Sequence, residues 1–543
     1  MMIVTNEKDE TAVVKAPRGK IRKAGVLGAA TTLAGGSALA MMTALAGSAS
    51  AATFTVDQAT DDGSGTVSGT LSWAIAQAEL DDAADVIDFS PSLTTITFSG
   101  DPSQVPITNS LSITGPGSGL LTIDLNNNCH LAAVLDSDAD LRVSGITIEN
   151  GNVSTSSATQ GCAETGDHYE GGGLVVLYGG ADTSVTISDV TFQNNSAYYY
   201  GGGFSCNGTA QVTIENSLFD GNENVEGDGG GAYLNCELSL TISGSTFSNN
   251  TALEGTGGGV LVRTDNGVGS LIVNSTFSGN TASNGGGIGV GNGNSVVLNS
   301  TISGNTAGDG GGLYGDSPIS LIQSTVTGNE ASFDGGGMNW KLGTFGNTFT
   351  TFDILMSTIS GNAANTGNEL HVEQINSSYQ DASIVGSVIA GTGAGDAVSV
   401  AAAFQADPAD FPVKVSYSVL GAVSGPPLID VEGNTLDVTD PMLEELADNG
   451  GPTMTMLPLD GSPVIDAGPP TVPVYSGNEF DQRGTPYART YNGTVDVGAV
   501  ETQPGPTPPT SSTTTTTSPA PSTTIAPDPE PEDSDPVVPA FAG

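Results

Sequence analysis

The sequence predicts an all-β protein folded as a parallel β-helix, and three observations support this fold class. Gly-Gly-Gly recurs seven times, from the triplet at Gly171 to the one at Gly335, at intervals of 25 to 30 residues. A second motif, Phe or a β-branched residue followed three positions later by Asn, recurs in phase with the triplets. Between these motifs apolar and polar residues alternate, as at 184–188 and 239–242, which is typical of half-buried strands. A period of roughly 20–50 residues indicates stacked repeats, so each repeat is expected to form one coil.

The repeats contain no helical periodicity long enough for ankyrin, TPR or most leucine-rich folds. Val, Ile, Thr and Phe favour strands, and the recurring Gly and Asn suit turns that need a positive φ. We therefore expect two or three short strands per coil, with roughly ten to twelve coils about 4.8 Å apart between residues 111 and 420. Such a stack would be a rod with broad side faces.

The recurring Asn is expected at a turn. Asn tolerates a left-handed backbone there and can hydrogen-bond the Asn of the coils above and below. We predict a structural ladder, with glycan contact through the same side chains as the alternative. The ladder would consist of Asn195, Asn222, Asn250, Asn280, Asn305, Asn329 and Asn362.

Residues 1–51 are predicted to be an export signal. Five Lys and Arg residues between positions 15 and 23 precede an apolar run from 24 to 47, and Ala-Ser-Ala at 49–51 fits a cleavage site. No other apolar stretch is long enough to cross a bilayer, so we expect no transmembrane span in the mature chain. These features predict a secreted or cell-surface protein.

Both ends of the β-helix are expected to carry caps, because an open end would expose unpaired strand groups. Residues 52–110 are predicted to form the N-terminal cap, and 69–80 within them resemble an amphipathic helix. Residues 421–501 are predicted to be a C-terminal module. Residues 502–543, rich in Thr, Pro and acidic residues, are predicted to be a disordered tail.

The chain is strongly acidic, with a formal net charge of −47. A surface of this charge repels nucleic acid and anionic lipid, so no nucleic-acid partner is expected. It can also collect divalent cations, which leaves structural Ca²⁺ as an alternative to a generic acidic exterior. The sequence places no metal site and indicates no other cofactor.

Four cysteines in an exported chain predict two disulfides. Cys129 and Cys162 are 33 residues apart, and Cys206 and Cys236 are 30 residues apart, which is about one coil in each case. Bonds within these two couples would join neighbouring coils. Three pairings are possible for four cysteines, and the sequence does not choose among them.

Several segments resemble known bacterial surface proteins. The stretch FTVDQATDDGSGTVSGTLSWAIAQAE, from Phe54, resembles the start of large right-handed β-helix proteins with a CSLREA-type N-terminal region, although their usual Leu-Arg-Gln-Ala-Ile is Leu-Ser-Trp-Ala-Ile here. LADNGGPTMTMLPLDGSPVIDAG (446–468) and DQRGTPYARTYNGTVDVGAVE (481–501) resemble the choice-of-anchor module of the same proteins. The repeats also resemble, more loosely, those of chlamydial polymorphic outer-membrane proteins. The resemblance implies a right-handed helix and an adhesive or cell-surface role without a shared ligand.

No catalytic residue is assigned from the sequence. Right-handed β-helices include polysaccharide lyases and hydrolases, so the fold alone does not decide the function. The cations along the coils are few, and the best acid–base pairing, Arg263 with Asp265, is interpreted as a surface ion pair. A lyase or glycoside hydrolase that acts on an acidic polysaccharide remains the alternative function.

Aromatic side chains are the candidate contacts for a ligand, because sugar rings pack on aromatic faces. The candidates for glycan or partner contact are Tyr198, Tyr199, Tyr200, Tyr233 and Trp340, with simple loop packing as the alternative. The sequence therefore predicts a non-catalytic, adhesin-like or structural protein. Its expected partners are polysaccharides, cell-surface glycans or proteins, bound along the rod.

Overall fold

The computed structural model describes residues 50–154, 170–264, 269–342, 344–345, 348–349, 352–374, 382–393, 395–402 and 413–503. The chain divides into two units, Met1–Ser48 and Ala49–Gly543, and every described residue belongs to the second. Most of the predicted export signal and nearly all of the predicted tail lie outside the described residues. No helix in the described part is both long and apolar enough to cross a membrane.

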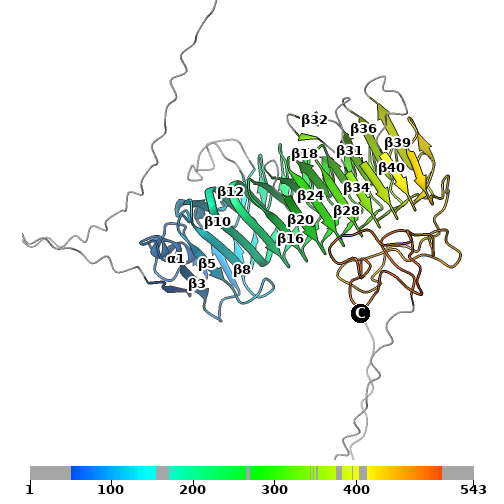
Figure 1. The fold of residues 1–543 in the computed structure, drawn as a ribbon. Helices are drawn as coiled ribbons and strands as arrows, with labels where there is room; N and C mark the ends of the chain where they lie inside the picture. Colours follow the sequence, from blue (N-terminus) through cyan, green and yellow to red (C-terminus); the bar gives the residue numbers. More distant parts are fainter. Residues whose placement is uncertain are drawn as a thin grey trace, which may run out of the picture. The chain divides into compact units, whose positions relative to one another are not determined.

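Parallel strands of successive coils pair in register and stack in columns (Figure 1). The first column contains the strands that follow the glycine triplets and their equivalents. They are β7 (Leu131–Leu135), the start of β10 (Leu174–Gln193), the start of β12 (Phe204–Glu215), β15 (Ala232–Cys236), β19 (Val260–Arg263), β23 (Ile288–Gly291), β27 (Leu313–Gly315), β31 (Met338–Leu342), β36 (Leu370–Gln374), β39 (Val398–Ala402) and β42 (Val423–Ser424).

The second column runs through the whole stack from its first coil. It contains β1 (Thr53–Val56), β3 (Asp85–Phe89), β5 (Leu111–Thr114), β8 (Asp140–Glu149), later parts of β10 and β12, β16 (Leu240–Ser243), β20 (Gly269–Val273), β24 (Asn294–Leu298), β28 (Ile319–Ile322), β34 (Phe352–Leu355), β37 (Ala382–Val385), β40 (Val413–Ser416) and β43 (Ile429–Glu432).

The third column follows the second after a tight turn. It contains β2 (Thr60–Asp61), β4 (Thr95–Phe98), β6 (Thr122–Asp124), the ends of β8 and β10, β13 (Leu218–Asp220), β17 (Thr246–Ser248), β21 (Thr276–Ser278), β25 (Thr301–Ser303), β29 (Thr325–Thr327), β35 (Thr358–Ile359), β38 (Val388–Ile389) and β41 (Val419–Leu420).

A separate parallel sheet forms the short fourth column, just before the triplets. Its strands are β9 (Asn152–Val153), β11 (Ser196–Ala197), β14 (Glu223–Asn224), β18 (Thr251–Thr256), β22 (Thr281–Asn284), β26 (Thr306–Asp309) and β30 (Glu330–Ala331). The remaining elements are an antiparallel pair, β32 (Thr344–Phe345) with β33 (Thr348–Phe349), the helix α1 (Leu71–Ala78) and a 3₁₀ turn at Pro102–Gln104. The predicted all-β parallel β-helix with one N-terminal helix is therefore confirmed.

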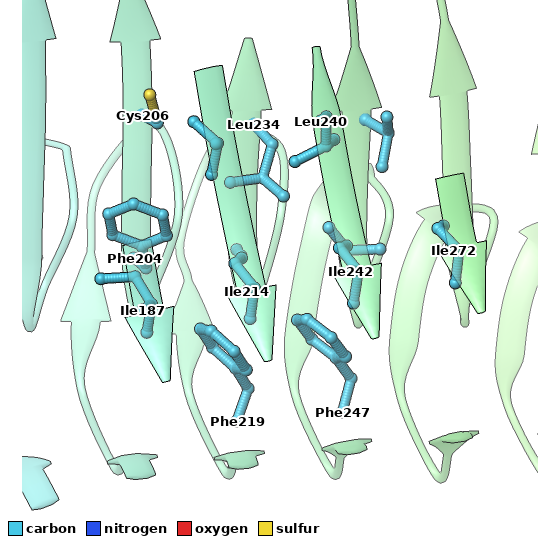
Figure 2. Close-up of a cluster of buried hydrophobic side chains, with 14 of the residues drawn as sticks. Ile187, Phe204, Cys206, Ile214, Phe219, Leu234, Leu240, Ile242, Phe247 and Ile272 are labelled. Carbon is cyan, nitrogen blue, oxygen red and sulfur yellow. The ribbon is translucent and has the colours of Figure 1, made fainter. Parts of the chain in front are cut away.

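The core lies inside the coils, where every second side chain of a strand points inward (Figure 2). Phe192, Phe219, Phe247 and Phe277 form a continuous stack in the third column, with ring centroids 4.4 to 4.9 Å apart. All four rings are fully buried. Their spacing is close to the strand spacing, so the repeat itself places each ring against the next.

The seven asparagines that lie three residues after a Phe or its β-branched replacement form a continuous hydrogen-bonded ladder. At each step Nδ2 donates to the Oδ1 of the Asn in the next coil, as from Asn250 to Asn280 at 2.9 Å. The backbone N–H of the same residue donates to that oxygen as well. Glu369 ends the ladder, because its carboxylate accepts bonds from Nδ2 and N–H of Asn362 at 2.6 and 3.2 Å. Each amide is thus satisfied without water.

Glu369 stands where the glycine triplets end, as the third residue of Gly-Asn-Glu at 367–369. Ile359 pairs with Ile389, so Thr392 stands where the next Asn would be, and a Cβ at the preceding Gly391 would lie 2.2 Å from Oε1 of Glu369. Burial raises the pKa of this carboxyl to about 7. The carboxylate therefore fills the space in which the ladder would otherwise continue.

Residues 441–501, which we call the C-terminal segment, dock on outward side chains of the third column. Thr325 donates through Oγ1 to Oε1 of Gln482 at 2.6 Å, and Nε2 of Gln482 donates to the carbonyl of Ser300 at 3.2 Å. Thr301 donates to the carbonyl of Met454, and the N–H of Ala499 donates to Oγ1 of Thr358. These bonds join positions more than 140 residues apart in the sequence.

The possible bond between Cys206 and Cys236 does not form, because Cys206 is a free, buried thiol; the expected second disulfide is therefore wrong. The register places Leu234 opposite Cys206 and Cys236 opposite Gly208, so one coil of separation does not bring the two cysteines face to face. The side chain of Cys206 points into the core (Figure 2). Cys129 is disulfide-bonded, and Cys162 lies outside the described residues.

Candidate functional site

Three rows of side chains run along the outer surface beside the glycine triplets, which we call the corner face. The corner row contains the residue before each triplet: Glu170, Tyr200, Asp228, Thr256, Asn284, Asp309, Asp334 and Thr366. The inner row contains the second residue of the first-column strands: Ser205, Tyr233, Leu261, Gly289, Tyr314, Asn339, His371 and Ser399. The outer row lies two residues further on: Asn207, Asn235, Arg263, Gly291, Asp316, Lys341 and Glu373.

The inner row lies deep in the angle between the triplets and the first column. The first glycine of each triplet has a φ between 60° and 77°, which side chains other than Gly rarely adopt. A Cβ at Gly310 would lie 2.9 Å from Cβ of Tyr314, so an inner-row side chain packs directly on the turn. The corner row and the outer row are therefore the rows that a ligand could reach.

Four tyrosines gather at the N-terminal part of the corner face. The rings of Tyr198 and Tyr199 meet edge to face at 4.6 Å, and that of Tyr200 stacks on Tyr233 at 4.3 Å. Tyr199 is 39% exposed and Tyr198 and Tyr200 are half-buried, so three rings of this tyrosine cluster reach the surface. Mutual ring contacts fix their orientation, which lowers the entropy lost when a ligand binds.

Tyr233 itself is only 3% exposed, and the prediction that it contacts a ligand is wrong. Its inner-row position puts it beneath Tyr200, and burial raises the pKa of its hydroxyl to about 12. Arg263 borders the cluster, where its guanidinium lies 3.7 Å from the carboxylate of Asp228. The expected partner of Arg263, Asp265, lies outside the described residues.

Trp340 is fully buried, so the prediction that it contacts a glycan is also wrong. It stands opposite Gly315 in the register, and a Cβ at Gly315 would lie only 2.4 Å from the indole ring. The indole Nε1 donates to the carbonyl of Ser317 at 3.1 Å. The missing side chain in one coil thus makes room for the large one in the next.

Charged groups gather at the C-terminal part of the corner face. Nζ of Lys341 lies 3.7 Å from Glu373 and 5.3 Å from the ring centroid of Tyr314. His371 is 5% exposed, and burial lowers its pKa despite nearby carboxylates, of which Asp334 is the strongest influence. Each exposed cation of the face therefore already has an anionic partner, and the imidazole is neutral near pH 7.

Within the described ranges, no three His, Cys, Asp or Glu side chains come together in a way that could hold a metal ion. The carboxylates of the corner face are instead spread along the stack, at Glu170, Asp228, Asp309, Asp316, Asp334 and Glu373. Pairing with Arg263 and Lys341 compensates part of their charge. The arrangement suits hydrogen bonding with a ligand better than cation binding.

Apart from Tyr200, the residues that precede the glycine triplets were not among the predicted site residues. They were visible as a column of Glu, Tyr, Asp, Thr and Asn at one fixed repeat position. Their importance depends on the concave angle at the triplets, which brings them over the next strand. Strand alternation alone does not reveal such an angle.

Comparison with known families supports the fold and leaves the ligand open. A family model described as a right handed beta helix region matches residues 173–354, about a third of the chain. A search of curated proteins found no match. The family match and the parallel stacking of the coils together give a right-handed parallel β-helix.

Proposed function

We propose that this chain is a secreted or cell-surface protein that binds glycans through the corner face without cleaving them. The observation that carries the proposal is the tyrosine cluster, in which Tyr198, Tyr199 and Tyr200 present ring surfaces beside a packed and rigid coil stack. Surface location rests on the predicted export signal and on the resemblance of both ends to adhesive bacterial surface proteins. The same resemblance makes an adhesin-like role the preferred one.

The geometry of the cluster favours a flat ligand with both apolar faces and polar edges. Aromatic rings supply the apolar contact, and the carboxylate of Asp228 and the guanidinium of Arg263 lie beside them as acceptor and donor. Sugars combine both features. A protein partner that presents similar groups is the alternative ligand for the same surface.

Cleavage of an acidic polysaccharide is a second candidate function, supported by the gathering of Lys341, Glu373 and His371 on adjacent coils. A lyase needs a free base beside the substrate, and Lys341 is already held by Glu373 and Tyr314. The paired state of this lysine makes binding the better-supported function.

The test uses the purified protein with a panel of neutral and acidic polysaccharides, followed by size-exclusion chromatography of both components. We expect at least one polymer to co-migrate with the protein at unchanged length. Tyr199→Ala should abolish co-migration, whereas Tyr491→Ala, a half-exposed tyrosine of the C-terminal segment, should not. A shortened polymer would favour the enzymatic alternative, and no co-migration with any polymer would contradict glycan binding.

A further inference from the structure

Outward hydroxyl groups form a regular array on the third column. One row pairs a threonine with a threonine at every step: Thr246, Thr276, Thr301, Thr325 and Thr358. A second row lies two residues further along each strand: Ser248, Ser278, Ser303 and Thr327. Parallel pairing repeats these groups about every 4.8 Å.

The C-terminal segment covers only part of this array. It buries Thr301, Thr325 and Thr358, each of which hydrogen-bonds a residue of that segment. Beside the covered part runs a groove of about 480 Å³. It is lined by Asn249, Ser278, Gly279, Ser303, Gly304, Thr327, Gly328 and Leu446.

The groove is shallow, and glycines at the turn after the third column leave it open. A Cβ at Gly304 would meet no atom within 4 Å, and one at Gly328 would meet only the backbone N of Gly304 at 3.8 Å. Both glycines have a φ of 64°. Leu446, brought in by the docked C-terminal segment, supplies the apolar lining.

Thr327 offers a hydroxyl to the groove. It lines the groove and is 8% exposed, and no hydrogen bond of its hydroxyl occurs among the described residues. Thr325, two residues earlier, has the partner Gln482. The hydroxyl of Thr327 can therefore donate to or accept from a ligand in the groove.

The chemistry of the lining selects the ligand class. None of its residues is charged, and the whole chain has a formal charge of −47, so an anionic ligand would be repelled without any compensating cation. The hydroxyl and amide groups can both donate and accept hydrogen bonds. Their spacing along the coils is similar to the repeat of an extended pyranose chain.

We propose that this groove binds an uncharged glycan chain, whose hydroxyl groups bond Ser278, Ser303 and Thr327 and whose rings pack on Leu446. The site is separate from the tyrosine cluster, because it lies on the third column and not beside the glycine triplets. It therefore goes beyond the proposed function by adding a second surface and by naming a ligand class.

The chain itself suggests a variant that fills the groove without strain. Asn249 occupies the position equivalent to Gly304 two coils earlier, with a φ of 55°. Asn tolerates this backbone, so Gly304→Asn should fold and place a side chain in the groove. Gly221→Asn is the matched control, since Gly221 has the same motif position and a φ of 64° but does not line the groove.

The experiment measures dissociation constants for hexasaccharides of glucose, mannose and N-acetylglucosamine, with hexagalacturonate as the acidic comparison. We expect a neutral hexasaccharide to bind, Gly304→Asn to weaken binding by about tenfold or more, and Thr327→Val to weaken it by up to about tenfold through loss of one hydrogen bond. Gly221→Asn should leave binding unchanged. Circular dichroism would show that the variants are folded.

Three results would overturn the proposal: no neutral hexasaccharide binds, Gly304→Asn and Thr327→Val bind as tightly as the parent protein, or hexagalacturonate binds equally well. The outcome for the tyrosine cluster is distinguishable. Binding that is lost in Tyr199→Ala but kept in Gly304→Asn would support the proposed function and refute this groove.

Discussion

Glu369 should make the stability of the β-helix depend on pH in a way that one substitution removes. Its side chain is 1% exposed and ends the asparagine ladder, and its pKa is raised from 4.5 to about 7, chiefly by burial. The folded state therefore holds the proton more tightly than the unfolded state. The stabilising contribution is complete below about pH 4.5 and is lost as the pH rises through 7.

The expected size follows from the two pKa values. Between pH 5 and pH 8 a shift from 4.5 to about 7 lowers the free energy of unfolding by about 2–3 kcal/mol. Glu369→Gln keeps an oxygen for Asn362 but turns an NH₂ group toward the N–H of Gly361, which now donates to Oε1 at 3.0 Å. The variant should thus lose about 1–3 kcal/mol at pH 5, and the difference between variant and parent should shift by about 2–3 kcal/mol in favour of the variant at pH 8.

The assay is urea unfolding at pH 5 and pH 8, followed by the fluorescence of Trp340. This buried indole lies on β31, which pairs with β36 directly after Glu369, and Trp73→Phe removes the only other tryptophan. Glu501, whose pKa burial also raises to about 7, contributes equally to both proteins and cancels in the difference. An equal change in stability with pH in the parent and in Glu369→Gln would refute the reasoning.

Three further predictions concern the ladder, the free thiol and the docked segment. Asn250→Ala should lower the free energy of unfolding by about 2–4 kcal/mol, because it leaves the N–H and Nδ2 of Asn222 without their acceptor. The control Asn249→Gly, at an exposed position with a positive φ, should lower it by less than about 0.5 kcal/mol. If denaturant unfolding gave the same loss for both variants, the ladder would not be stabilising. Cys206 should resist maleimide in the native protein and react after denaturation without reductant, so rapid native labelling would show that it is exposed. Gln482→Ala should speed hydrogen exchange in residues 441–501 but not in the asparagine ladder. The control Gln503→Ala loses only a bond to Ala488 and should leave exchange in residues 441–501 unchanged. Unchanged exchange in Gln482→Ala would contradict docking through Gln482.

The coil, the period and the stacking residues could be predicted from the sequence because they repeat. The F-x-x-N motif keeps a nearly constant distance from the glycine triplets, and this is enough to align Phe247 and Asn250 with their equivalents in the other coils. A second ladder was missed although it repeats too. Serines such as Ser245 and Ser275 accept through Oγ from the backbone N–H of the equivalent residue in the preceding coil. Their signal is a Ser two residues before each Phe or its replacement from Phe219 onward.

The wrong predictions for Trp340 and Cys206 came from judging these residues by type and spacing and not by whether their side chains point into or out of the coil. Trp340 stands two residues after the first inward residue of its strand, as Cys206 does, so both point into the core. Counting positions from the glycine triplet would have revealed this. Tyr233 points outward from its strand, but Tyr200, at the turn before the triplet, covers it. This burial could not be predicted without the angle between the fourth and first columns.

The docking of the C-terminal segment could not be predicted, because its contacts connect distant residues through geometry that no local pattern records. The outward threonines were evident as a repeated T-x-S or T-x-T motif, yet nothing in the motif identifies Gln482 as a partner 157 residues away. A row of outward hydroxyls can face water, a ligand or another part of the chain. In this structure the C-terminal segment covers part of the first row, whereas Ser278, Ser303 and Thr327 of the second row line the groove.

That division links the second proposed site to the docked segment. Thr325 is satisfied by Gln482, whereas Thr327 on the same strand faces the groove, of which Leu446 forms the apolar lining. If docking fails, the groove loses Leu446 and the array becomes an open face. Gln482→Ala should therefore weaken binding of a neutral hexasaccharide to the groove while leaving the tyrosine cluster intact. Retention of full groove affinity in that variant would mean that the hydroxyl array binds without the C-terminal segment, and that the segment serves only to cover the threonines.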